Sequence, residues 1–84
     1  MKTVTVRYFA SIREALGTGS ESVATSATTL AALRDQLIAR GGAHAEALAR
    51  GKAVRVALDQ VMSDESAALA DGAEVAFFPP VTGG

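Results

Sequence analysis

Hydrophobic and polar residues alternate along residues 3–9, which is the pattern of a β-strand with one buried face. Val4, Val6 and Tyr8 share the apolar face, whereas Phe9 falls on the polar face with Thr and Arg side chains. Similar alternation, or short apolar runs bounded by turn residues, predicts four later strands. These strands are expected at residues 22–25, 54–58, 61–62 and 74–78.

A stripe of apolar residues at helical spacing predicts the main helix. Thr28 is placed to cap its N-terminus, and the pair Gly41–Gly42 ends it. The stripe consists of Leu30, Leu33, Leu37 and Ile38. It should lie across the sheet and form much of the core.

Two shorter helical segments flank this helix in the sequence. In residues 11–16, Ser11 and Glu14 have the spacing of a capping box, and Gly17 supplies a stop. Residues 43–50 are rich in Ala and could add another helical turn.

The order of the elements defines the expected fold class. Two strands, one main helix and further strands indicate an α+β domain with a mixed sheet. A helix that joins a first hairpin to later strands favours a last strand parallel to the first. This is the β-grasp, or ubiquitin-like, fold, expected over residues 1–78, with residues 79–84 as a flexible protruding tail.

Few side chains suited to catalysis are present. The chain has no Cys and a single His44, which argues against a thiolate nucleophile, a multi-histidine metal site and a Ser-His-Asp triad. His44 lies between two alanines and is interpreted as a surface residue. No P-loop occurs, so ATP would be used by a partner enzyme. We expect a chain that binds no metal or cofactor and is not an enzyme by itself.

The charge distribution narrows the choice of partners. The formal net charge is −1, which argues against nucleic acid, and neither a signal peptide nor a membrane-spanning run is found, so a cytoplasmic protein without a membrane partner is expected. Residues 56–84 carry 5 acids and no base, whereas residues 1–55 carry all 8 basic residues. The acids are either solvated turn residues or complementary to a basic partner surface.

The last residues have features suited to chemistry on the chain terminus. Pro79 and Pro80 end the last strand, and six residues from Pro79 could extend roughly 20 Å. Gly83 and Gly84 leave the terminal carboxylate without neighbouring side chains, so it could enter a narrow tunnel. Activated as a mixed anhydride with AMP, that carboxylate can be attacked by a sulfur or amine nucleophile. The alternative is a frayed terminus without function.

An apolar patch is expected where this tail begins. Phe9 and Phe78 lie on the polar faces of their strands, and parallel pairing would bring them to the same end of the sheet. Met62 extends the patch, unless loops cover these side chains into a secondary core. Arg13 lies nearby, either as a solvated charge or as a partner for a carboxylate or phosphate.

These residues carry a resemblance to a known family. The resemblance is carried by the ending Glu74-Val-Ala-Phe-Phe-Pro-Pro-Val-Thr-Gly-Gly84, together with Tyr8-Phe9-Ala10, Arg13-Glu14 and Gly17. In these residues the chain closely resembles the MoaD family, the small sulfur-carrier subunits of molybdopterin synthase. The resemblance covers essentially the whole chain, and it implies the β-grasp fold. It also implies that a MoeB-like adenylating enzyme uses ATP to form an acyl-adenylate, which a sulfur donor protein converts into a thiocarboxylate.

The resemblance further implies a large catalytic subunit, MoaE-like, in a heterotetramer. The thiocarboxylate would there donate sulfur to cyclic pyranopterin monophosphate, and two carriers would complete the dithiolene of molybdopterin. The resemblance assigns Gly84 as the modified residue, Gly83 as the narrow approach to it, and Phe9, Met62 and Phe78 as contacts with the partners. We add Thr82 and Val81 to the tail that enters the partner, and Arg13 to the partner interface because it lies just past Phe9. Met62 stands where a leucine is expected, and nothing is carried over for residues 40–53.

Three rival functions remain from the sequence. A ThiS-like carrier for thiazole synthesis would share the chemistry but usually lacks the Phe-Phe-Pro-Pro stretch. A ubiquitin-like modifier would be joined to lysines of other proteins. A plain interaction domain would tolerate the loss of Gly83 and Gly84.

Overall fold

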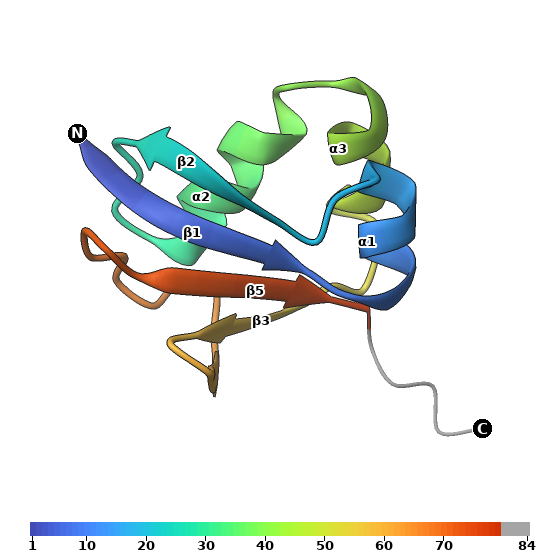
Figure 1. The fold of residues 1–84 in the computed structure, drawn as a ribbon. Helices are drawn as coiled ribbons and strands as arrows, with labels where there is room; N and C mark the ends of the chain where they lie inside the picture. Colours follow the sequence, from blue (N-terminus) through green and yellow to red (C-terminus); the bar gives the residue numbers. More distant parts are fainter. Residues whose placement is uncertain (80–84) are drawn as a thin grey trace.

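A five-stranded mixed sheet forms the body of the molecule in the computed structural model, which describes residues 1–79 (Figure 1). The strands are β1 (Lys2–Tyr8), β2 (Ser20–Thr25), β3 (Arg55–Leu58), β4 (Val61–Ser63) and β5 (Glu74–Phe78). They lie in the order β2-β1-β5-β3-β4. β1 and β5 are parallel, and the other neighbouring strands are antiparallel. The β-grasp expectation is therefore confirmed, while the tail beyond Pro79 lies outside the described residues.

Three helices complete the fold: α1 (Ala10–Leu16), α2 (Leu30–Ile38) and α3 (Gly42–Ala47). The main helix, α2, lies across one face of the sheet, and the other face is open (Figure 1). Leu30, Leu33 and Leu37 of α2 are fully buried, as the stripe predicts, and Ile38 packs at its margin. From the sheet, Val4, Val6, Tyr8, Val75 and Phe77 supply the facing side of the core.

The cap of α2 differs by one residue from the expectation. Thr29, not Thr28, is the N-cap, and its hydroxyl oxygen accepts a hydrogen bond from the backbone N–H of Ala32 at 3.2 Å. Thr28 is held outside the helix because its carbonyl accepts from the N–H of Leu69 at 2.9 Å. A long-range backbone pairing thus decides which threonine caps the helix.

The capping box predicted for α1 is wrong. The helix begins at Ala10, so Phe9 holds the N-cap position without a side-chain hydrogen bond, and Ser11 lies within the first turn. The predicted stop is confirmed: Gly17 has φ +73°, which favours glycine, and its N–H donates to the carbonyl of Arg13. Because α1 connects β1 to β2, these two strands pair without a tight hairpin turn.

The acids of the C-terminal third largely serve the fold. Asp59 and Gln60 both have positive φ at the turn between β3 and β4, and the Asp59 carboxylate accepts from the N–H of Glu74 at 3.0 Å. Asp71 accepts from the N–H of Thr3 at 2.8 Å beside the turn at Gly72. These contacts favour the interpretation as turn residues over complementarity to a basic partner.

Candidate partner-docking site

Phe9 and Phe78 meet on the open face of the sheet. The register pairs Tyr8 with Phe77, so the residues that follow them, Phe9 and Phe78, project from the same end of the sheet. The two rings are 6.3 Å apart, centroid to centroid, and stand nearly perpendicular at 85°. Phe9 is 40% exposed, and Phe78 is half-buried. The expected juxtaposition is confirmed, and no loop of the described residues covers the pair into a secondary core.

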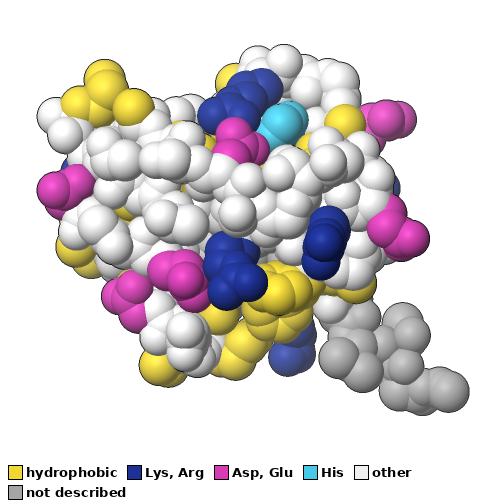
Figure 2. Space-filling model, in the orientation of Figure 1, with side chains coloured by type: hydrophobic (Ala, Val, Ile, Leu, Met, Phe, Trp, Pro, Cys, Tyr) yellow, Lys and Arg dark blue, Asp and Glu magenta, His cyan; other side chains and the backbone are white. Residues whose placement is uncertain are grey.

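Met62 extends this apolar surface across the sheet. It pairs with Ala57, which in turn pairs with Ala76, so the three side chains share one row of the open face. Met62 is 52% exposed, whereas the two alanines lie low between their larger neighbours. We call the surface formed by Phe9, Phe78, Met62, Ala57 and Ala76 the apolar patch. Figure 2 shows hydrophobic side chains gathered on this face between Lys and Arg side chains.

Two arginines, Arg7 and Arg55, border the apolar patch, and a third, Arg13, lies on α1, which begins directly after Phe9. The guanidinium carbon of Arg7 lies 5.3 Å from the centroid of the Phe9 ring, within the range of a cation–π contact. Arg55 is the register partner of Phe78. Arg13 is exposed on α1, and its guanidinium packs against Gly19, where an added Cβ would lie 3.2 Å from Nε. Within residues 1–79, none of the three forms an ion pair.

The chain leaves the sheet beside the apolar patch. Pro79 directly follows Phe78 and lines a small hollow together with Ser11 and Ala15 of α1 and with Lys52 and Val54. The residues predicted to carry the chemistry or to enter a partner, Val81, Thr82, Gly83 and Gly84, lie outside the described residues. The structure thus brings Phe9 and Phe78 together where the chain leaves the sheet, with Met62 on the same face and Arg13 on the adjoining helix α1.

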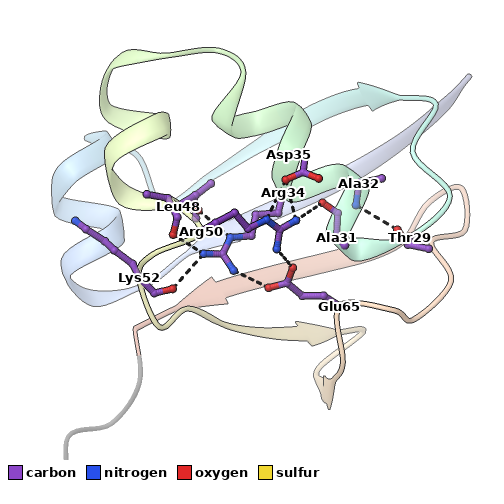
Figure 3. A network of polar contacts seen from close by, with 10 residues as sticks. Thr29, Ala31, Ala32, Arg34, Asp35, Leu48, Arg50, Lys52 and Glu65 are labelled. Atoms are coloured by element: carbon purple, nitrogen blue, oxygen red, sulfur yellow. Dashed lines mark hydrogen bonds and ion pairs between the residues drawn. The ribbon is translucent and has the colours of Figure 1, made fainter.

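A buried arginine network was missed by the sequence analysis (Figure 3). Arg34 of α2 is 3% exposed; it donates to the carbonyls of Leu48 (2.8 Å), Ala49 (2.7 Å) and Lys52 (3.2 Å) and to the Glu65 carboxylate (2.6 Å). Arg50 also donates to Glu65. Burial opposes ionisation of Glu65, but the hydrogen bonds from Arg50 and Arg34 outweigh it and lower its pKa. The network holds the segment that leads into β3. This segment includes Lys52, which lines the hollow beside Pro79.

A second polar cluster joins the end of β1 to α3. The Tyr8 hydroxyl donates to Glu21 at 2.7 Å, and Glu21 also pairs with Arg40 at 2.6 Å and with His44 at 3.0 Å. Burial opposes ionisation of Glu21, yet these hydrogen bonds from His44, Arg40 and Tyr8 lower its pKa to about 2. Burial and the bond to Glu21 raise the pKa of Tyr8. His44 is therefore held in this cluster with its side chain 22% exposed, more buried than the surface position that was expected.

Neither cluster resembles a catalytic or metal centre. Residues 1–79 contain no group of three or more His, Cys, Asp or Glu side chains arranged to hold a metal ion. The same part of the chain contains no helix long and apolar enough to cross a membrane. A β-grasp body with an apolar patch at the root of its C-terminal segment defines a ubiquitin-like protein whose distinctive surface is suited to docking.

The comparisons with known proteins give the family. Residues 6–84 match the model of the ThiS family, and the chain belongs to this family. It is 43% identical over 81 residues to the molybdopterin synthase sulfur carrier subunit of Escherichia coli K12, covering 96% of this chain and 99% of the relative. It is 39% identical over 79 residues to the protein of the same name from Haemophilus influenzae, covering 94% and 96%.

Solved structures agree in fold. SAMP1 from Haloferax volcanii, a small archaeal modifier protein, has a TM-score of 0.76 at 26% identity, with 98% of this chain and 99% of that chain covered. Subunit 1 in the complex of subunits 1 and 2 of molybdopterin-converting factor from Helicobacter pylori has a TM-score of 0.68 at 28% identity, covering 98% and 99%.

Proposed function

We propose that this chain is the sulfur carrier subunit of a molybdopterin synthase. The observation that carries the proposal is the 43% identity to a protein of that name over nearly the full length of both chains. The site geometry supports it, because the apolar patch lies where the chain leaves the sheet. A partner that binds the patch therefore receives the C-terminal segment at its own active site.

In the proposed cycle, the reacting group is the terminal carboxylate of Gly84. A MoeB-like adenylating enzyme joins this carboxylate to AMP from ATP and releases pyrophosphate. Sulfide-level sulfur (HS⁻) released by a sulfur donor protein then attacks the acyl carbon, the bond to AMP breaks, and a thiocarboxylate remains. This chain binds no cofactor in the cycle and is not an enzyme by itself, because ATP is bound by the adenylating partner. We place the cycle in the cytoplasm.

The carrier that bears the thiocarboxylate then docks on the large catalytic subunit, in a heterotetramer of two carriers and two large subunits. Its tail residues Val81, Thr82 and Gly83 enter the active site, and Gly84 donates its sulfur to cyclic pyranopterin monophosphate. Since the dithiolene has two sulfur atoms, two carriers must each give up the sulfur of their thiocarboxylate for each molybdopterin formed. The complex of two molybdopterin-converting factor subunits from Helicobacter pylori supports a partnership of this kind.

Phe78→Ala and Phe9→Ala are expected to weaken binding to the large subunit by about 10- to 100-fold in Kd, because buried aromatic anchors carry much of an interface's binding energy. Isothermal titration calorimetry measures the loss. Val61→Ala is the matched control, since Val61 is 64% exposed and lies outside the apolar patch. Binding by both Phe variants as tight as by the wild-type chain would contradict the assignment of the patch.

A protein modifier is the second candidate, supported by the similarity to SAMP1. The two functions are separated by incubating the chain with its adenylating enzyme, ATP and a cell extract. Attachment to lysines would appear as isopeptide-linked adducts of higher mass. The carrier function predicts instead that the chain with a C-terminal thiocarboxylate, together with the large subunit, converts cyclic pyranopterin monophosphate into molybdopterin. A ThiS-like carrier would support thiazole formation and not this conversion.

A further inference from the structure

The arginines beside the apolar patch differ from the other arginines of the chain. Arg34, Arg40 and Arg50 each form an ion pair with a carboxylate. Arg7, Arg13 and Arg55 form none within residues 1–79, although the chain as a whole has a formal net charge of −1. We call these three residues the arginine rim. The arginines without an ion pair in this part of the chain are thus the three near the apolar patch. Lys2, whose ammonium donates to the carbonyl of Ala27, and Lys52, in the hollow beside Pro79, also form none.

Three carboxylates lie toward the other end of the open face. Glu74 pairs in register with Thr5, at the start of β5, and Asp59 binds the N–H of Glu74. Asp71 binds the N–H of Thr3 near the start of β1. Asp64 lines the same depression as Arg55 without forming an ion pair with it. The three arginines therefore lie near the end where the chain leaves the sheet, and Asp64 is a carboxylate in the same region that pairs with none of them.

The position of the arginine rim sets a requirement for any partner. Arg7 lies against the Phe9 ring and Arg55 lies beside Phe78, so a surface that covers both rings also removes water from both guanidinium groups. Removing water from a charged group is unfavourable unless an opposite charge replaces the water. Carboxylates around the partner's recess would meet this requirement and would also accelerate encounter at low ionic strength.

From this arrangement we infer that the apolar patch and the arginine rim fit a recess of the large subunit whose border carries carboxylates. The inference rests on the proposed function. The apolar contacts hold the complex, while Arg7 and Arg55 increase its rate of formation and orient it. Arg13 adds to the same positive field from α1.

The test is the association rate of the chain with the large subunit, measured by stopped-flow fluorescence between 20 mM and 500 mM NaCl. Over this range the Debye length falls from about 20 Å to about 4 Å, so electrostatic attraction is progressively screened. The double variant Arg7→Gln, Arg55→Gln should associate about 10-fold more slowly than wild type at the lowest salt and about equally fast at the highest. Lys2→Gln is the matched control for the single variant Arg7→Gln, because each removes one positive charge and Lys2 lies at the opposite end of β1 from Arg7. It should leave the rate unchanged.

A second pair of variants separates charge from packing on Phe9. Arg7→Lys keeps the positive charge and should retain most of the wild-type rate at low salt, whereas Arg7→Gln should not. Equal rates for wild type and the double variant at every salt concentration would overturn the inference, as would a wild-type rate independent of salt. If either outcome is found and the wild-type chain still supports molybdopterin formation, the proposed function stands and only the inference about the arginine rim is lost. Failure of the wild-type chain to bind or to support molybdopterin formation would overturn both.

Discussion

Deleting Gly83 and Gly84 is expected to abolish molybdopterin formation in a reaction reconstituted with the adenylating enzyme, a sulfur donor and the large subunit. The chain contains no Cys, so no side-chain thiol can take over the transfer of sulfur. The truncated chain ends at Thr82, whose side chain beside the carboxylate is poorly suited to a tunnel shaped for glycine. Product formed in the reaction is measured directly by chromatography with fluorescence detection.

The truncation should leave the rest of the molecule intact. The core and the apolar patch are built from residues that precede Pro79, so the thermal unfolding midpoint should match that of the full chain. Thr82→Ser serves as a control that alters the tail but keeps both glycines, and it should retain activity. Wild-type levels of molybdopterin from the truncated chain would show that its C-terminal glycines are not the reacting end.

Arg34→Met is expected to lower the free energy of unfolding by about 3–5 kcal/mol, the cost typical of breaking a buried, hydrogen-bonded charge pair. The substitution keeps most of the side-chain volume but leaves the carbonyls of Leu48, Ala49 and Lys52 without their donor. Urea unfolding followed by circular dichroism gives the difference.

Arg50→Met is the comparison for this network. The Arg50 side chain is 44% exposed, so its ion pairs with Asp35 and Glu65 are screened by solvent and should contribute about 1 kcal/mol or less. The account requires a clearly larger loss of stability for Arg34→Met. Similar losses for the two variants would show that burial of Arg34 adds nothing to the strength of its contacts.

Much of the fold follows from local patterns in the sequence. The alternation around Val4, Val6 and Tyr8 and the leucine stripe of α2 predict the buried faces, because a side chain's face depends only on its position in a strand or helix. The apolar patch was predictable for a similar reason. Once the first and last strands are placed side by side and parallel, Phe9 and Phe78 have to project at the same end.

The polar networks could not be predicted in the same way. Arg34 is separated by 31 residues from Glu65, and Tyr8 by 13 from Glu21, so these contacts exist only after the elements have packed. A signal was nevertheless present in each case. Arg34 lies four residues after Leu30 beside the apolar stripe, and a tyrosine on a core face needs a partner for its hydroxyl. Which carboxylate meets either residue depends on the tertiary arrangement.

The central claim is that the terminal carboxylate of Gly84 carries sulfur, and the most direct test is the intact mass of the protein. The chain is incubated with a MoeB-like adenylating enzyme, ATP and a sulfur donor, and its mass is compared with a sample lacking ATP. The account predicts a gain equal to one sulfur atom minus one oxygen atom, located by fragmentation to Gly84. An unchanged mass, in the presence of an adenylating enzyme that charges its own carrier, would contradict the claim.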